Sequence, residues 1–546
     1  MPPTSARALK PDDFIILCNL STGLLRQERI GEAEAVARRA IEVAPQQPAV
    51  HRQLASVLAM QDRPRDSIET LRTVLKLDPA DDSVGAELLY QARQICDWAT
   101  VADLTPTVIA GMESALAEGR KPVATPFTAI AIAPALEGAV ARAWADEIED
   151  LALAVAKPFV HTNNRRRDGP LRIGYLSGDY RAHATMHLIG SLFVRHNRDR
   201  VRCFAYSYGM DDQGASRKRV EIESDGFADL RLASDRDAAA RIHNDGIDIL
   251  VDLKGHTSGA RLAIPALRPA PVQLTWIGFP GPIGARFLDY TLVDNVVVPP
   301  EQRDRYVEGL CYLPNCYQIN DDTLGDIAFE TDRVRHGLPA NAFVFASFNR
   351  LYKLHAGIVD LWARILAAVP GSVLWLYRSR VEAVENVLAG FAARGIDPSR
   401  ILFAPPLAKL AHLQRIPLAD LAIDTFPING HTTTSDCLRG GLPVVATLGE
   451  HFASRVSASL LQTVGLGELV VPTEDEYVAL AVALARDPAR LAALRARATD
   501  GIGNSPLFDT KRFVRNLETA YDTIWRHHRD GALPRVLEIE EGGRDG

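Results

Sequence analysis

The sequence predicts an α/β protein with two doubly wound lobes in tandem, preceded by an all-α region of helical repeats. Three observations support this fold class. Helical segments that end in proline recur at a fixed period near the N-terminus, and two series of short apolar strands alternate with helices from residue 170 onwards. The length of 546 residues corresponds to about three or four domains of ordinary size. Apolar strands that alternate with helices are typical of a parallel sheet covered on both faces.

The helical repeats are predicted over residues 1–95. Pro45 ends the run IEVAP and Pro79 ends the run LKLDP, so the spacing is 79 − 45 = 34 residues, the period of tetratricopeptide repeats. Small residues such as Ala37 and Ala40 let paired helices approach closely, and proline stops the second helix of a pair. Two repeats are clear, and 83–97 is predicted to form part of a third. A plain helical bundle is the alternative.

A helical linker is predicted over 96–168, followed by the two lobes. The stretch 135–156 is amphipathic, and the polar run HTNNRRRDGP at 161–170 marks a boundary whose arginines we expect to be solvated. The first lobe is predicted over 169–335 and the second over 336–510, with a closing helix and a flexible tail over 511–546.

The predicted strands define both lobes. Those of the first lobe are LRIGYLS (171–177), RCFAYSY (202–208), DILVDL (248–253), VQLTWIG (272–278) and DYTLVD (289–294). Those of the second lobe are FVFASF (343–348), SVLWLY (372–377), ILFAP (401–405), LAIDT (421–425), PVVAT (443–447) and LVVP (469–472). Ligands of such sheets bind at the carboxyl ends of the strands, so we expect the chemistry in a cleft between the lobes.

Composition excludes several classes of function. The chain has 61 basic and 68 acidic residues, a net charge of −7, so no basic excess indicates nucleic-acid binding. The six cysteines lack CxxC spacing, which argues against a zinc site or a disulfide framework. There is no apolar run of 18 residues and no secretory signal at the start. We therefore expect a cytoplasmic protein with no nucleic-acid or membrane partner.

The sharpest local signal is DTFPINGHTTTSDCLRGGLPVVAT at 424–447, which reads as strand, loop, helix and strand. Thr432 or Thr433 is predicted to cap the helix, with Asp436 near its first turn and His431 just before it. A helix start after a glycine-containing loop favours a phosphate or diphosphate, because its backbone N–H groups and positive dipole end face the ligand. A merely well-capped helix is the alternative.

Lys353, in FNRLYKL at 348–354, follows the first strand of the second lobe. At the carboxyl end of that strand it is a natural counter-charge for a leaving diphosphate. Without further context a solvated surface lysine is equally consistent with the sequence.

A pair of histidines follows the first strand of the first lobe. His183 and His187 in LSGDYRAHATMHLIG are four residues apart and come after Asp179. A histidine facing a cleft can orient or deprotonate a hydroxyl acceptor, although a packing role is more common, and the metal signature HExxH is missing. The only DxD, Asp235–Arg236–Asp237, lies in a helical stretch. We therefore expect backbone amides, lysine and histidine, rather than a metal ion, to hold any diphosphate.

Several long motifs occur in the order of a known family. They include QICDW (94–98), LSGDYRAHATMHL, DGIDILVDLKGHTSGAR (245–261), RPAPVQLTWIGFPG (268–281), FNRLYKL, DTFPINGHTTTSD, ASRV (453–456) and SPLFDTKRF (505–513). With them the chain resembles the O-linked N-acetylglucosamine transferase/SPINDLY family of glycosyltransferases over most of residues 94–530, and its composition, rich in alanine and arginine, points to a bacterial member.

The resemblance implies a GT-B fold with two Rossmann-like lobes. It also implies an inverting, metal-independent transfer of a sugar, N-acetylglucosamine from UDP-GlcNAc as the main reading, to Ser or Thr hydroxyls of a protein acceptor, with no cofactor. Lys353 matches the lysine that stabilises the leaving diphosphate, and His183 matches a histidine on the acceptor side that has been proposed as the base. The matched positions that contact the donor are His431, Thr432 and Thr433 at the phosphates, Asp436 at the ribose, Lys409, His412 and Arg415 at the base, and Ile277 and Gly278 at the sugar.

The sequence departs from the animal members at four points. Arg350, counted with the donor-binding residues, stands where they carry Gln, and Ile428 stands where they carry Cys in the sugar pocket. Their long insert between the lobes is absent, and the repeat array is short, which predicts a small peptide groove and a narrow range of acceptors, such as a single envelope or flagellar protein.

Three alternatives follow from the sequence. The same fold could use another donor, such as GDP-fucose or a flagellin-modifying sugar. The chain could be a non-catalytic tetratricopeptide adaptor, although the set of Lys353, His431 and Asp436 argues against that reading. A sugar-nucleotide epimerase also has two Rossmann-like lobes.

Overall fold

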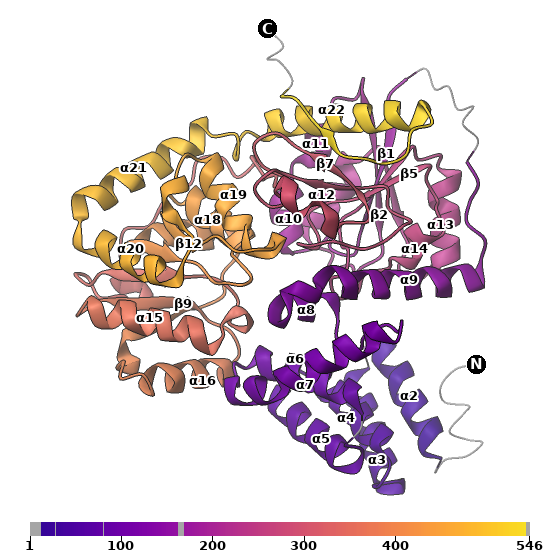
Figure 1. Ribbon diagram of the computed structural model, residues 1–546, viewed down its shortest axis with the longest axis horizontal. Coiled ribbons are helices and arrows are strands. Elements are labelled where there is room, and N and C mark those ends of the chain that lie inside the picture. The colour runs from indigo at the N-terminus through magenta and orange to yellow at the C-terminus, as the bar shows by residue number, and fades with distance from the viewer. Residues whose placement is uncertain (1–12, 28, 80, 162–168, 542–546) are drawn as a thin grey trace.

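The structure is a computed structural model that describes residues 13–27, 29–79, 81–161 and 169–541. It has three parts: a helical array at the N-terminus, a first α/β lobe and a second α/β lobe (Figure 1). The helical array lies below both lobes in this view, and the C-terminal helix runs from the second lobe back to the first.

Over the described residues the array consists of three antiparallel helix pairs, which confirms the predicted helical repeats. The third pair ends at Ala117, so the array extends beyond residue 95 into the stretch that was predicted as linker. Leu20, Leu54 and Leu88 occupy the same place in successive repeats, 34 residues apart, and are 7%, 5% and 2% exposed. Proline opens the second pair at both of its helices, where its missing N–H costs no helical hydrogen bond. The helices are α2 (Phe14–Arg26), α3 (Ile30–Val43), α4 (Pro48–Met60), α5 (Pro64–Leu77), α6 (Asp82–Gln94) and α7 (Trp98–Ala117).

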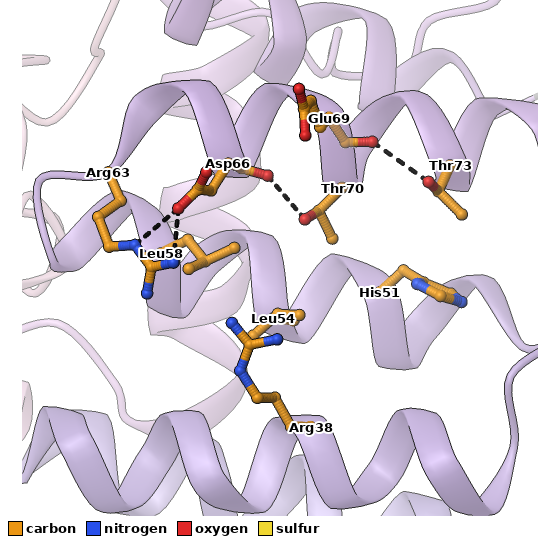
Figure 2. A pocket seen from close by; sticks show the side chains of 9 residues that line it. All are labelled: Arg38, His51, Leu54, Leu58, Arg63, Asp66, Glu69, Thr70 and Thr73. Carbon is orange, nitrogen blue, oxygen red and sulfur yellow. Dashed lines mark hydrogen bonds and ion pairs between the residues drawn. The ribbon is translucent and has the colours of Figure 1, made fainter.

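A pocket of about 370 Å³ lies between α3, α4 and α5 (Figure 2). Its lining combines charged and polar side chains with Leu54 and Leu58. The cations there are already paired, since Arg38 contacts Glu34 and Arg63 contacts Asp66.

The linker joins the array to the first lobe through α8 (Pro126–Ile132), η1 (Pro134–Leu136) and α9 (Glu137–Val155). Helix α9 packs on the first lobe so closely that a side chain on Gly284 would overlap the α9 backbone at Arg142. The polar run predicted to end the linker falls mostly on 162–168, outside the described residues.

The first lobe is an eight-stranded parallel sheet in the order β14-β7-β6-β5-β4-β1-β2-β3. Its strands are β1 (Leu171–Ser177), β2 (Val201–Ser207), β3 (Gly226–Asp229), β4 (Ile249–Asp252), β5 (Val272–Thr275), β6 (Tyr290–Val293), β7 (Gly309–Tyr312) and β14 (Leu537–Glu538). Its helices are α10 (Ala184–Ile189), α11 (Leu192–Arg195), α12 (Ala215–Glu223), α13 (Asp235–Asn244), α14 (Ala263–Ala266) and η2 (Pro300–Arg305).

Strand β14 corrects the expectation of a flexible tail at its start. Leu537 and Glu538 pair in parallel with Cys311 and Tyr312 of β7, and Arg303 forms an ion pair with Glu538. The edge strand β14 therefore comes from the C-terminal end of the chain, far from β7 in the sequence. No local pattern in the sequence signals this pairing.

The second lobe is a six-stranded parallel sheet in the order β10-β9-β8-β11-β12-β13. Its strands are β8 (Val344–Ser347), β9 (Val373–Tyr377), β10 (Ile401–Ala404), β11 (Leu421–Ile423), β12 (Val444–Thr447) and β13 (Val470–Val471). Its helices are η3 (Val334–His336), η4 (Leu351–Lys353), α15 (Ala356–Ala368), α16 (Val381–Ala392), η5 (Pro398–Arg400), α17 (Lys409–Arg415), η6 (Ile416–Leu418), α18 (Thr432–Arg439), η7 (Phe452–Ser454), α19 (Val456–Thr463), η8 (Gly467–Leu469), α20 (Glu474–Arg486) and α21 (Pro488–Asn504).

The last helix, α22 (Thr510–Arg529), follows α21 of the second lobe and packs on the first lobe. Phe513 stacks on Trp276 of the first lobe with ring centroids 5.7 Å apart, and the hydroxyl of Tyr521 lies 3.0 Å from that of Tyr175. The two α/β lobes confirm the predicted fold class. Among the described residues, no helix has the length and apolar character needed to cross a bilayer.

Candidate functional site

The candidate residues lie at the switch points of the two sheets. Strand order reverses between β1 and β4 in the first lobe and between β8 and β11 in the second. His183 follows β1, Lys353 follows β8, and the loop 424–431 follows β11. Open α/β sheets bind ligands at such points, because the connections diverge to opposite faces there and leave the carboxyl ends of two strands uncovered.

Lys353 is held by the loop that follows β11. Its Nζ donates to the backbone oxygen of Asn429 at 2.6 Å and to Oδ1 of Asn349 at 3.0 Å. The amide of Asn349 in turn donates to Asp424 at 3.0 Å. Burial lowers the pKa of Lys353 to about 8, and the nearby charge of Asp424 opposes this shift. The ammonium is therefore fixed in place and poorly hydrated, as a counter-charge for an anion should be.

Asp424 fixes the shape of the loop. Its carboxylate accepts hydrogen bonds from the backbone N–H of Gly430 at 2.7 Å and from the hydroxyl of Ser457 at 2.6 Å. Burial raises the pKa of Asp424, while these donors and Lys353 favour its charged form. Asp424 stands at the start of the loop 424–431, and its carboxylate links this start to Gly430 in the same loop and to Ser457 on α19.

The start of α18 differs from the prediction. The helix begins at Thr432, so His431 occupies the capping position that was predicted for Thr432 or Thr433, and no side chain caps the helix there. Asp436 is the fifth residue of α18, beyond its first turn. Because of the backbone conformation after Gly430, the capping position lies one residue earlier in the chain than Thr432. Thr432 and Thr433 are half-buried at the N-terminal end of the helix, where the dipole favours an anion.

His431 is neutral at physiological pH. Burial lowers its pKa to about 3, and the charge of Lys353 lowers it further. Its Nε2 lies 3.5 Å from the backbone oxygen of Ala453. A neutral imidazole beside Lys353 can donate a hydrogen bond without adding a second buried charge.

The residues matched to the nucleotide base and ribose form a second group. The ammonium of Lys409 forms an ion pair with Asp436, joining α17 to α18. His412 packs edge-on against Phe348 and Tyr377, with centroid distances of 5.1 and 6.3 Å. Burial lowers the pKa of His412 to about 4. The group thus places the neutral ring of His412, flanked by two aromatic rings, next to the half-buried ion pair of Lys409 and Asp436.

Arg415 lies behind His412. Its side chain is fully buried, it donates to Nδ1 of His412 at 2.9 Å and to the backbone oxygen of Pro405 at 2.7 Å, and it lies over Trp375. The sequence placed it beside the nucleotide base, whereas the structure puts it behind His412. There it fixes the His412 ring with the neutral Nδ1 turned inward.

The first lobe faces this site with α10. Helices α10 and α18 pack together, and the pKa of His187, lowered mainly by burial, also responds to the charges of Lys409 and Asp436. Arg350 is exposed, with its guanidinium 5.6 Å from the ring centroid of Tyr377. Its charge contributes to lowering the pKa of His183. Arg350 is therefore a cation of the second lobe whose charge acts on His183 of the first lobe.

The hydrogen bonds of His183 define its tautomer. Nδ1 lies 3.2 Å from the backbone nitrogen of Thr185, and accepting this N–H favours the neutral tautomer with its proton on Nε2. Asp179 lies 3.5 Å from Nδ1 and is paired at 2.9 Å with the buried ammonium of Lys254. Burial lowers the pKa of His183, with Asp179 opposing and Lys254 adding to the shift. In this state Nε2 donates a hydrogen bond and cannot accept a proton.

A tight turn lies at the carboxyl end of β5. Gly278 donates to the backbone oxygen of Trp276 at 2.8 Å, and Ile277 between them has φ of +63°, a region that β-branched residues rarely adopt. A side chain on Gly278 would overlap the carbonyl of Leu253. Strain of this kind is typical of functional sites. Ile428 is only 3% exposed and belongs to the same apolar cluster as Phe279 of the first lobe, so it packs between the lobes.

Sequence reasoning missed the residues that support this site. Asn349 and Asp424 lie within motifs that were noted, directly after β8 and β11, and their place at strand ends was the available signal. Lys254 had the same signal, since it follows β4 within a noted motif, but its partner Asp179 comes from a distant segment. Ser457 on α19 had no such signal, because its partner Asp424 is distant in the sequence. Within the described ranges, no three His, Cys, Asp or Glu side chains gather closely enough to hold a metal ion.

The opposing effects of burial and Asp424 predict how Lys353 titrates. We expect a midpoint near pH 8 for the Lys353 amine, measured by NMR on lysines carrying ¹³C-methyl groups and assigned by the loss of its signal in Lys353→Met. Asp424→Asn should lower the midpoint further, because the raising charge is removed while burial remains.

Asp420→Asn is the matched control for this titration. Asp420 flanks the other end of β11 and pairs with Arg333 at 2.8 Å, so its loss should leave the Lys353 midpoint unchanged. A midpoint near the ordinary value of 10.5 in the wild type would contradict the buried placement of Lys353.

Comparison with known proteins gives a consistent result. The family model described as glycosyl transferase family 41 matches residues 95–325 and 325–517. The chain is 36% identical over 469 residues to a probable UDP-N-acetylglucosamine–peptide N-acetylglucosaminyltransferase, SEC, of Arabidopsis thaliana, covering 83% of this chain and 48% of the relative. It is 36% identical over 392 residues to the SPINDLY protein of Solanum lycopersicum, which carries the same probable activity in its name, covering 69% and 41%.

A solved structure is similar over almost the whole chain. The O-GlcNAc transferase of Thermobaculum terrenum, in a lysine-to-methionine mutant, superposes with a TM-score of 0.72 at 28% identity, covering 96% of this chain and 93% of that one. The chain spans about half the length of the curated relatives it matches. The matched segments include both lobes and the candidate site, and on this evidence the chain belongs to glycosyl transferase family 41.

Proposed function

We propose that the chain transfers N-acetylglucosamine from UDP-N-acetylglucosamine to Ser or Thr hydroxyls of a protein, with inversion and without a metal ion or cofactor. The observation that carries the proposal is the Lys353 ammonium, held 2.6 Å from the Asn429 carbonyl beside the start of α18. The names of the relatives, which specify UDP-N-acetylglucosamine and a peptide, support this choice of substrates.

The second lobe would bind the donor along the loop 424–436. The diphosphate lies against the N-terminal end of α18, near His431, Thr432 and Thr433, with Lys353 as its counter-charge. The ribose and base extend towards Asp436 and His412. Lys409, already paired with Asp436, keeps that carboxylate in place to accept the ribose hydroxyls.

The reaction then needs one bond to form and one to break. The acceptor oxygen attacks the anomeric carbon from the face opposite the diphosphate, the bond from that carbon to the diphosphate oxygen breaks, and the hydroxyl proton leaves. Negative charge grows on the leaving diphosphate, and Lys353 with the helix dipole stabilises it in the transition state.

The tautomer of His183 bears on where the proton goes. Because Nδ1 of His183 accepts from Thr185 and Nε2 carries the proton, the neutral ring orients the substrates by donating a hydrogen bond. We propose that a phosphate oxygen of the donor accepts the hydroxyl proton, and that His183 positions the groups that react.

Replacing Lys353 by methionine removes the counter-charge while keeping an unbranched side chain of similar length. We expect the transfer rate to fall about a hundredfold or more, which is about 3 kcal/mol of transition-state stabilisation. The measurement is kcat for sugar transfer, with circular dichroism as the check on folding. Near-wild-type transfer by a folded Lys353→Met variant would contradict the mechanism.

The identity of the donor is tested with a panel of nucleotide sugars. The purified protein is incubated with host lysate and UDP-N-acetylglucosamine, GDP-fucose or other nucleotide sugars, with and without EDTA, and the glycosylated protein is identified by mass spectrometry. We expect transfer from UDP-N-acetylglucosamine, unchanged by EDTA. Transfer from GDP-fucose alone, donor binding without transfer, or epimerisation without an acceptor would each replace the proposal by a different one.

A further inference from the structure

The helical array contacts the second lobe directly behind Lys353. The turn between α6 and α7, Ile95–Asp97, packs against η4, the short helix that ends at Lys353. In Figure 1 the α6–α7 region lies beside α16 of the second lobe. The amide of Asn386 on α16 donates to the backbone oxygen of Ile95 at 2.8 Å, which fixes the turn from the other side.

Cys96 in this turn and Trp98, the first residue of α7, bind the backbone on either side of Lys353. The thiol of Cys96 donates to the backbone oxygen of Leu351 at 3.2 Å, and the indole N–H of Trp98 donates to that of Leu354 at 3.2 Å. Cys96 is 1% exposed, with φ of +56°, so its backbone adopts an uncommon conformation at the point of contact.

The surroundings of Trp98 are shaped to receive it. A side chain on Gly390 of α16 would overlap the Trp98 ring, so glycine lets the indole lie directly on that helix. Phe127 of α8 contacts Tyr352 edge-on at 6.4 Å, and thus the linker packs against the same short helix as the repeat turn.

The opposite side of η4 is anchored to the donor loop. His355, just after η4, lies with Nε2 at 2.9 Å from the backbone oxygen of Phe426, and Lys353 itself binds the carbonyl of Asn429. The segment 351–355 is therefore clamped between the repeat turn and the loop that follows β11. A shift of the turn moves the backbone of Lys353 relative to Asn429.

We propose that Cys96 and Trp98 are positioning residues for Lys353, through which the helical array sets the geometry of the donor diphosphate site. The catalytic consequence rests on the proposed function, whereas the positioning of the lysine does not. Both side chains bond the backbone around Lys353 from the side of η4 opposite the donor loop, so both act through the backbone of 351–354.

The test compares two tryptophans that make the same kind of bond. Trp98→Phe removes the N–H donor to Leu354 and keeps an aromatic ring. Trp144→Phe removes an equivalent donor, to the carbonyls of Pro122 and Ala124 at 3.0 and 3.1 Å in the linker, and is the matched control. Both full-length variants are measured for the titration midpoint of Lys353, for kcat and KM, and for thermal stability.

We expect Trp98→Phe to raise the Lys353 midpoint by about half a unit towards its ordinary value, because a looser segment lets water reach the ammonium. We expect kcat to fall about tenfold with little change in the acceptor KM. Trp144→Phe should lose a similar amount of stability and change neither the midpoint nor kcat.

The titration decides the proposal, since it needs no substrate and stands even if the sugar donor is different. An unchanged Lys353 midpoint in Trp98→Phe overturns it. If that variant does not fold, Cys96→Ala and Cys96→Ser take its place: serine keeps a donor to Leu351 and should retain the wild-type midpoint, while alanine should raise it. Equal midpoints in these two variants overturn the proposal as well.

Discussion

The site depends on one constraint, a half-buried lysine ammonium that has no direct ion pair. Lys353 is satisfied by a backbone carbonyl and an asparagine, and Asp424 acts on it at one remove, through Asn349. A directly paired lysine would already be neutralised, whereas this one keeps charge available for an anion. Asn349, Asp424 and Ser457 are therefore as much part of the site as the lysine, since they fix the loop that holds it.

The two sheets make this constraint possible. Each reverses strand order once, so β8 and β11 in the second lobe present Lys353 and its loop side by side, while β1 and β4 present His183 and Lys254 opposite them. The lobes are joined by α22 and by a buried contact in which Ser459 donates to Asp294 at 2.7 Å. The helical array packs behind Lys353, so the array and the donor loop of the second lobe meet at the short segment 351–355.

Much of the fold could be predicted from the sequence, because the 34-residue period and the apolar strands are local patterns that tertiary packing preserves. The site was predictable where a residue lies at the end of a strand, as Lys353 does. The position of a site residue was not predictable where it depends on backbone geometry or on a contact with a distant segment of the chain. His431 takes the cap position of α18 from Thr432, and Arg415 is buried behind His412. Cys96 and Trp98 meet η4 across more than 250 residues of sequence.

The most direct test of the account is calorimetric binding of UDP and of uridine to the wild type and to Lys353→Met. If Lys353 holds the diphosphate while His412 and Asp436 hold the nucleoside, the substitution weakens UDP binding about tenfold or more and leaves uridine binding unchanged. Equal losses for both ligands, or no loss for UDP, would contradict the assignment of Lys353 to the diphosphate.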